Sequence, residues 1–330
     1  MTSDHRTAPL GSAIGLRDMH FHAPRFRDYR WLETNTYSFT IPEARIGCHI
    51  WNGFRTNLGV VQSGITLFSS DNPGAGAMEL DYSDQCNHLP MPPDSLTDFS
   101  LANGLAVSMT KPLSEWDLRY EGADETVFDL HYRGLCPPLH ISETGTEAAG
   151  LGSIKYGHLD QMMAITGTVR LHGTVHAVNW PSWRDHSWSP RPEGAARGGY
   201  ASDVSANFDY GAFGDDFTFF VQTTQRWDSV DHAVVDHGYI TDGADVLRLK
   251  AGTGRFVYNG NWSTRSLVYE LEDERGRTHI FNGEAVSFHH IGPTVLAVVR
   301  WTNESGDVGW GQYDWHGNVY RQQTTKPPGF

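Results

Sequence analysis

The chain has 330 residues, of which 39% are hydrophobic, 12% are aromatic and 35 are glycine, and its formal net charge at pH 7 is −14. This length exceeds that of a usual single domain, and the abundance of aromatic residues and glycine favours strands and turns over helices. The negative charge and the lack of a basic run argue against binding to nucleic acid or to an anionic membrane surface, because both require clustered lysine and arginine.

The sequence shows no sign of export or membrane insertion. Residues 1–15 lack the basic start and apolar core of a signal peptide, and no apolar run is long enough to span a bilayer. Cys48, Cys86 and Cys136 are odd in number and far apart, which fits a reducing compartment better than a disulfide framework. We therefore expect a cytoplasmic protein without a membrane span. The sequence leaves room for a homodimer.

Residues 1–30 form a polar lead-in ahead of the first expected strand. Within it, His20 and His22 would lie on one side of an extended segment and resemble half a metal site. Such a pair more often consists of exposed surface histidines that bind nothing, and no compact motif supplies further metal ligands. We therefore predict no metal ion.

Strands are expected from residue 35 onward. Phe128, Leu130 and Tyr132 alternate with more polar neighbours, which is typical of a half-buried antiparallel strand. The other strands expected in this half are residues 37–41, 48–51, 58–68, 105–109 and 116–120.

Prolines and glycines between Pro137 and Gly152 make the best domain boundary, so residues 31–150 and 151–330 are predicted to form two domains. In the second, a strand at 165–171 turns at His172-Gly173 and returns through residues 175–180. The glycine-rich residues 195–214 are either a loop or short helix over a pocket or, slightly favoured, an ordinary long connection. The later strands expected are 217–227, 233–240, 246–249, 266–272, 279–281, 286–290, 295–301 and 308–315. Short strands at this regular spacing indicate barrels or sandwiches.

The stretch from Trp180 to Arg191 holds three tryptophans, an acid, an imidazole and two arginines, a density that strand packing alone does not require. If it is extended, Trp183, Asp185 and Ser187 share one face, while the residues between them share the other. We expect one face to line a pocket and the other to meet a supporting layer. A one-residue bulge would exchange Asp185 and His186.

An acid flanked by aromatic side chains suits proton chemistry on an apolar substrate, because partial desolvation raises a carboxyl pKa toward a useful range. Asp185 is therefore the candidate acid–base residue, and His186, Tyr156 and His158 are candidates to orient it, position water or accept a proton. The candidate substrate-binding residues are Trp180, Trp183, Trp188, Arg184, Arg191 and Gln161. The alternative is a structural Asp185–Arg191 ion pair with the tryptophans as core filler.

The run Arg184-Asp185-His186-Ser187-Trp188-Ser189-Pro190 resembles the signature of bacterial lipocalin-like proteins of the AttH and carotenoid 1,2-hydratase superfamily, with Ser189 where that family usually has glycine. Weaker matches are Gly104–Tyr120, His158–Gln161 and Gly309–Tyr313. The resemblance implies an all-β fold of two lipocalin-like antiparallel β-barrels side by side, with the second barrel carrying Asp185. It also implies hydration of an isolated alkene without a metal or organic cofactor, and it gives Asp185 the role of the family's proposed proton donor.

The chain lacks a serine-hydrolase elbow, a CxxC pair, an HExxH motif, a P-loop and a dinucleotide fingerprint. We therefore expect a cofactor-independent hydratase, dehydratase, isomerase or cyclase acting on a hydrophobic terpenoid, polyene or aromatic compound. A non-catalytic lipocalin-like binding protein for an apolar ligand is the main alternative. A metal-dependent enzyme of another β-barrel family is the third.

Overall fold

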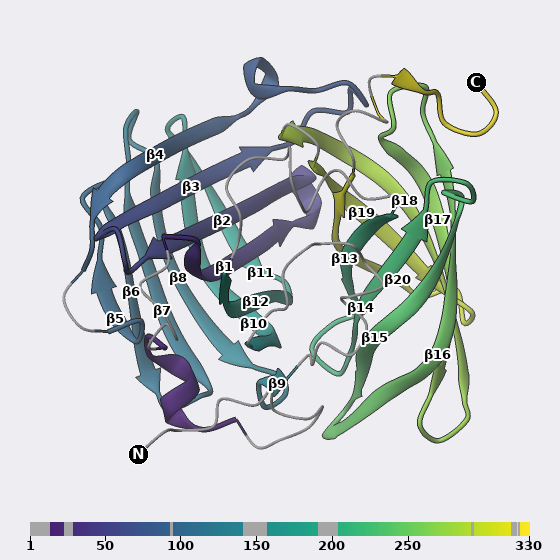
Figure 1. The fold of residues 1–330 in the computed structure, drawn as a ribbon, viewed down its shortest axis with the longest axis horizontal. Helices are drawn as coiled ribbons and strands as arrows, with labels where there is room; N and C mark the ends of the chain where they lie inside the picture. The colour runs from purple at the N-terminus through teal and green to yellow at the C-terminus, as the bar shows by residue number, and fades with distance from the viewer. Residues whose placement is uncertain are drawn as a thin grey trace.

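The computed structural model of the protein describes residues 14–22, 29–92, 95–140, 157–190, 204–291, 294–317, 322 and 324–330. These residues form a large curled sheet and a closed barrel that lie side by side (Figure 1). Short 3-10 helices are η1 (Leu16–Met19), η2 (Pro42–Ala44) and η3 (Ala77–Glu79). No helix in this part of the chain is long and apolar enough to cross a membrane.

The curled sheet has the strand order β4-β3-β2-β1-β12-β10-β8-β7-β6-β5, and β9 and β11 pair with β10 outside this path. Its strands are β1 (Trp31–Ile41), β2 (Ile46–Arg55), β3 (Val60–Phe68), β4 (Tyr82–Pro90), β5 (Asp98–Ser100), β6 (Leu105–Lys111), β7 (Glu115–Glu121), β8 (Val127–Gly134), β9 (Leu139–His140), β10 (Gly157–Leu171), β11 (Thr174–Asn179) and β12 (Ser182–Pro190). The alternation in the sequence decides which face of the sheet is buried: Trp116, Leu118 and Tyr120 of β7 are buried on the concave side, while intervening residues are more exposed.

The closed barrel is built from eight consecutive antiparallel strands. They are β13 (Val204–Ala212), β14 (Phe217–Arg226), β15 (His232–Asp242), β16 (Asp245–Tyr258), β17 (Thr264–Asp273), β18 (Thr278–Ile291), β19 (Thr294–Asn303) and β20 (Val308–His316). Aromatic rings fill the interior, including the fully buried Trp301 and Trp315, and each buried ring contributes roughly 2–3 kcal/mol. The expected all-β fold with two lipocalin-like units is confirmed, the first unit being a curled open sheet.

Glycine is required where β13 and β20 close the barrel. Gly211 and Gly311 stand opposite each other in this strand pair. A Cβ atom at position 311 would lie 1.9 Å from the carbonyl oxygen of Tyr210, closer than any real contact. The two strands can therefore pair here only because position 311 has no side chain.

The structure corrects two expectations about the chain's organisation. Strands β10 and β12, which the sequence analysis assigned to the second barrel, pair within the first sheet, so Asp185 belongs to the sheet. The proline- and glycine-rich segment before β10 indicates a connection but does not determine which strand the chain pairs with next.

The second correction concerns the glycine-rich residues 195–214. Residues 204–212 form strand β13, because Phe208 and Tyr210 alternate with their neighbours as in a strand despite the glycines around them. Residues 195–203 lie outside the described part.

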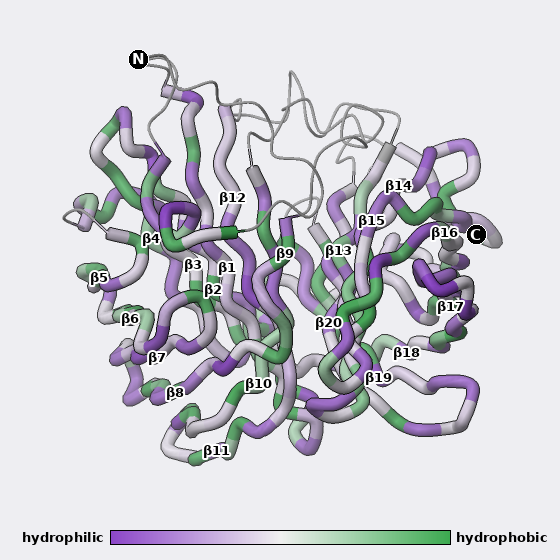
Figure 2. Tube along the Cα trace, turned by 90° about the horizontal axis from the view of Figure 1, so that it is seen from below, coloured by the Kyte–Doolittle hydropathy of each residue, from purple (hydrophilic) through white to green (hydrophobic). Residues whose placement is uncertain are grey.

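The sheet and the barrel meet along β1, β10 and β12 on one side and β13 and β20 on the other (Figure 2). We call this contact the seam. Its apolar core consists of Cys136, Met162, Trp183, Ala206, Phe208, Tyr210, Phe220 and Tyr239. Direct hydrogen bonds cross it: the Gln312 side chain donates to the Phe39 carbonyl at 2.8 Å, and Ser182 donates to the Tyr210 hydroxyl at 2.6 Å. Cys48, Cys86 and Cys136 form no disulfide.

Acid is expected to weaken the contact between β18 and β3, because a neutral histidine is buried there. His289 packs against Phe68, with 3% of the residue exposed, and burial together with His290 and His49 lowers its pKa from 6.5 to about 4. The unfolded chain therefore binds more protons than the folded protein as pH falls from 6.5 to 4, and folding stability decreases in that window. Between pH 7 and pH 5, protonation of His289 in the unfolded chain should lower the free energy of unfolding by about 2 kcal/mol.

Chemical denaturation at both pH values should reveal a smaller acid-induced loss of stability in His289→Gln than in the wild type. His232→Gln is the matched control because the His232 side chain is 63% exposed. Equal pH dependence in the wild type and His289→Gln would show that His289 does not contribute.

Candidate functional site

Strand β12 lies in the middle of the curled sheet, between β1 and β10. Each residue of its motif therefore has neighbours on both sides: Asp185 stands opposite Thr36 of β1 and Asp160 of β10. Because the strand is regular in both pairings, its side chains alternate between the two faces of the sheet. This position brings groups from distant parts of the sequence to the motif.

The two faces of β12 meet different surroundings. Trp183 points into the seam, where its ring lies 6.3 Å from Tyr210 and 6.1 Å from Phe220. Asp185 shares that face. His186 and Trp188 lie on the concave side, where Trp188 joins the sheet's hydrophobic core. Asp185, and not His186, therefore faces the seam, and no bulge exchanges them.

Three ionisable side chains meet on the seam face, and we call His158, Asp160 and Asp185 the seam triad. His158 Nε2 lies 3.5 Å from Asp160 Oδ2 and 3.4 Å from Asp185 Oδ2. The His158 and Asp160 side chains are almost fully buried, whereas the Asp185 side chain is 13% exposed. Two carboxylates directly opposite each other on neighbouring strands repel. A proton held by His158 or by one of the carboxyl groups relieves that repulsion.

The barrel contributes aromatic and ionisable groups to the same seam. The ring of Phe208 lies 6.0 Å from His158 and 5.5 Å from His316, and His316 Nε2 is 3.2 Å from Asp314 Oδ1. On the sheet side, burial lowers the pKa of His49, although the charges of Asp314 and Asp185 oppose this shift. Apolar and proton-carrying groups are thus combined at the seam.

Several residues predicted for the site serve other purposes. The Gln161 amide donates to the Leu113 and Cys136 carbonyls, and its oxygen accepts a 3.0 Å bond from Arg184 on the concave side. The indole of Trp180, which follows β11, donates to the carbonyl of Trp310 in β20. The structure therefore brings His158, Trp183 and Asp185 together but places Arg184, His186, Trp188 and Gln161 on the opposite face. Tyr156 and Arg191 lie outside the described residues.

The sequence analysis missed Asp160, Phe208 and Glu33 as site residues. Asp160 could have been predicted from the sequence, because it follows His158 by two positions and therefore shares its face of the strand. Phe208 lies in β13, which was interpreted as a connection. Glu33 stands on β1 and carries no local signal linking it to a motif about 150 positions later.

Among the residues that the structure describes, two groups of side chains have ligand atoms close enough together to hold a metal ion. One is the seam triad; the other, on the concave side, consists of His22, Glu33 and His186, and in each group the ligand atoms lie within 4.8 Å of one another. His20 and His22, which the sequence analysis compared to half a metal site, point to different surroundings: His20 is exposed, and His22 turns toward Glu33.

A cavity of about 610 Å³ opens beside β9 and β10. Leu113, Leu135, Leu139 and Gln161 are among its lining residues, and Arg248 lines it from the barrel side. The described lining does not include the seam triad, although Leu139 pairs directly with Asp160. The cavity is thus separated from the triad by the β9–β10 strand pair.

Comparison with solved structures places this architecture among known folds. An AttH protein from Nitrosomonas europaea is 12% identical over 95% of this chain and 99% of its own, with a TM-score of 0.58. CghA solved with Sch210972 is 12% identical over 87% of this chain and 88% of its own, with a TM-score of 0.55. Kievitone hydratase from Nectria haematococca superposes less well, with a TM-score of 0.48 at 12% identity over 88% of this chain and 89% of its own. The resemblance expected from the central motif is thus confirmed at the level of the fold.

No functionally curated protein matches the chain by sequence. One sequence family does match: it is described as a domain of unknown function, DUF7064, and its match covers residues 16–319. Because that match spans nearly the whole chain, the protein is a member of the DUF7064 family.

Proposed function

We propose that the protein is an acid–base enzyme of the hydratase, dehydratase, isomerase or cyclase type acting on a hydrophobic small molecule. The observation that carries the proposal is the seam triad, in which His158 Nε2 lies within 3.5 Å of both the Asp160 and the Asp185 carboxylates. A carboxyl group and an imidazole in contact, beside aromatic rings, are the parts that proton transfer to an apolar substrate requires.

In the hydration direction, protonated Asp185 gives its proton to one carbon of an alkene, and a cation forms at the other. Trp183 and Phe208 stabilise the cation through their ring faces, worth roughly 1–2 kcal/mol each. Water adds to the cation and loses a proton to His158. Because His158 Nε2 is 3.4 Å from Asp185 Oδ2, it can return that proton and restore the starting state. Dehydration follows the same steps in reverse, and isomerisation omits the water.

Asp160 acts through His158 in this scheme. It is fully buried and lies 3.5 Å from His158 Nε2, so its negative charge stabilises the imidazolium that forms when His158 accepts the proton. No organic cofactor is needed for these steps. The structure of CghA with Sch210972 supports a small-molecule role, since it records a protein of this fold together with such a molecule.

The proposal is tested by incubating the purified protein with pooled apolar alkenes and tertiary or benzylic alcohols and analysing products by mass spectrometry. We expect a gain or loss of one water mass, or an isomer with a shifted retention time, that requires active protein. A molecule that co-purifies and is released unchanged, with no product from any pool, would contradict catalysis. That result would instead support the alternative, a non-catalytic binding protein for an apolar ligand.

A further inference from the structure

The N-terminal segment, residues 14–22, crosses the concave side of the curled sheet and is fixed there by buried contacts. Met19 is 2% exposed, and its sulfur lies 3.5 Å from the Arg184 guanidinium. The Phe21 ring meets the Phe54 ring edge-on at 5.4 Å. The segment ends in His22, whose ring stacks on Trp188 at 3.6 Å with an interplanar angle of 8°.

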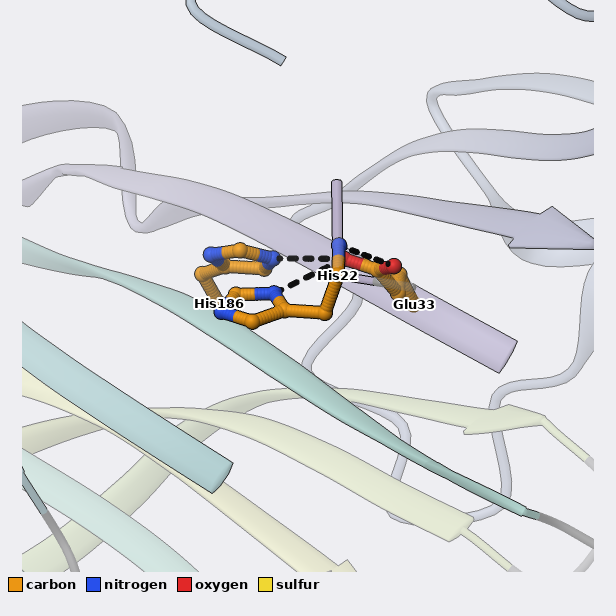
Figure 3. A group of neighbouring side chains, drawn as sticks. All are labelled: His22, Glu33 and His186. Atoms are coloured by element: carbon orange, nitrogen blue, oxygen red, sulfur yellow. Dashed lines mark hydrogen bonds and ion pairs between the residues drawn. The ribbon is translucent and has the colours of Figure 1, made fainter. Parts of the chain in front are cut away.

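Three potential metal ligands converge at this point from three separate parts of the chain (Figure 3). Glu33 Oε2 of β1 lies 3.2 Å from His22 Nδ1 and 3.4 Å from His186 Nε2 of β12. In a tetrahedral zinc site with bonds of about 2.1 Å, ligand atoms lie about 3.4 Å apart. The two separations to Glu33 therefore match two edges of a tetrahedron around one ion, and the His22 and His186 ligand atoms lie within 4.8 Å of each other.

The outer contact of the His186 imidazole suits metal binding. His186 Nδ1 lies 2.9 Å from the Asp18 carbonyl oxygen, and His22 Nε2 lies 4.0 Å from Asp18 Oδ1. Metal-binding histidines characteristically direct their second nitrogen at a carbonyl or carboxylate, which fixes the ring and its tautomer. The Asp18 carbonyl is thus the acceptor for His186, whereas the Asp18 carboxylate is too far from His22 Nε2 for a hydrogen bond. Glu33 Oε1 in turn accepts from the His22 backbone N–H at 2.7 Å and from the Trp31 indole at 3.3 Å, so Oε2 remains directed at the imidazoles.

The hydrogen bonds of His186 leave its Nε2 atom without a donor, although Nε2 faces a second acceptor. A carbonyl oxygen only accepts, so His186 Nδ1 carries the proton toward Asp18, and in the neutral ring Nε2 is a bare lone pair. That lone pair faces a carboxylate oxygen at 3.4 Å, and Nε2 makes no hydrogen bond among the described residues. The Glu33 side chain is fully buried and the His186 side chain is 4% exposed. Two buried acceptors directed at each other need a positive charge between them.

We propose that His22 Nδ1, Glu33 Oε2 and His186 Nε2 bind one divalent metal ion with the coordination preference of zinc. Two imidazoles and a carboxylate form a ligand set that zinc favours. The ion joins the N-terminal segment to β1 and β12. It lies on the opposite face of β12 from Asp185, so the site is independent of the proposed proton chemistry.

The test is zinc binding by the purified full-length protein after treatment with a chelator, titrated against a chromophoric competitor. We expect one equivalent to bind and Glu33→Gln and His186→Gln each to lower the affinity by at least about 100-fold. Asp185→Asn is the matched control, because it alters the second candidate group across the same strand and should leave this affinity unchanged. Loss of zinc from Asp185→Asn with retention in Glu33→Gln would overturn the assignment.

A second measurement needs no variant and so does not depend on how the variants fold. Cobalt(II) added to the stripped wild type should give the intense visible bands of a four-coordinate site and should quench tryptophan fluorescence, because Trp188 stacks on the ligand His22. No stoichiometric binding and no such bands in the wild type would overturn the proposal. The cluster would then be held by a proton shared between His186 and Glu33.

Discussion

Asp185→Asn is expected to reduce kcat by about 10²- to 10⁴-fold on any substrate found for the enzyme, since general acid catalysis contributes that much. The amide matches the carboxyl group in shape and can still form a hydrogen bond with His158, but it has no acidic proton to give. Substrate binding and thermal stability should change little. Initial rates, KM and a thermal melt of the variant would measure all three.

Asp117→Asn provides the control for this prediction. Asp117 forms a similar carboxylate–imidazole pair, with Oδ1 2.8 Å from His131 Nδ1, but both side chains are about 40% exposed on the outside of the sheet. The control should retain full turnover. If His158 and Asp185 act as one unit, then His158→Gln combined with Asp185→Asn should be little worse than the more damaging single change. Wild-type rates in Asp185→Asn would remove the acid role.

Arg184→Ala is expected to destabilise the protein by about 3–5 kcal/mol, because it removes a large buried side chain and leaves its partners unsatisfied. Arg184 is 2% exposed, its guanidinium lies 4.5 Å from the centroid of the Trp116 ring, and its Nε donates to Gln161 at 3.0 Å. Without it, a cavity opens and the Gln161 oxygen loses its donor. Denaturation followed by tryptophan fluorescence would measure the loss.

Two further variants separate the effect of lost side-chain volume from the effect of lost charge on stability. Arg184→Met refills most of the space without a charge and should recover at least half of the lost stability, because a buried ion can often be replaced by an apolar side chain of similar size. Arg119→Ala is the exposed counterpart: Arg119 is 71% exposed and pairs with Asp129 at 3.5 Å, so its loss should cost less than about 1 kcal/mol. A cost below 1 kcal/mol for Arg184→Ala would contradict a structural role for this side chain.

The local character of the central motif could be predicted from the sequence, but its neighbours could not. Alternation at a period of two placed Asp185 and His186 on opposite faces, and the strand β12 has that arrangement. Local alternation does not specify the partner strand, because pairing is set by contacts over the whole sheet. The sequence could not show that β12 lies between β1 and β10 of the first sheet. For the same reason it could not show that Arg184, which was expected to bind substrate, is buried against Trp116.

The burial of strand β1 is a second feature that the sequence alone does not reveal. Every residue of β1, from Trp31 to Ile41, is buried, including the polar run Glu33-Thr34-Asn35-Thr36. A strand that is polar in alternate positions normally has one face in water. In β1 the seam covers one face and the sheet's own core the other, so its polar residues mark internal hydrogen-bonding sites. Distinguishing these two cases requires knowledge of the barrel that covers the strand.

Strand β12 carries ionisable site residues on both of its faces, with Asp185 on the seam side and His186 on the concave side. This arrangement limits how the motif can change during evolution. Substituting one residue alters one side and leaves the other intact, so the seam and the concave site can diverge separately. Inserting or deleting one residue would invert every later side chain, moving His186 toward the barrel and Asp185 into the apolar core. We therefore expect members of this family to vary in the residues of β12 while keeping its length constant.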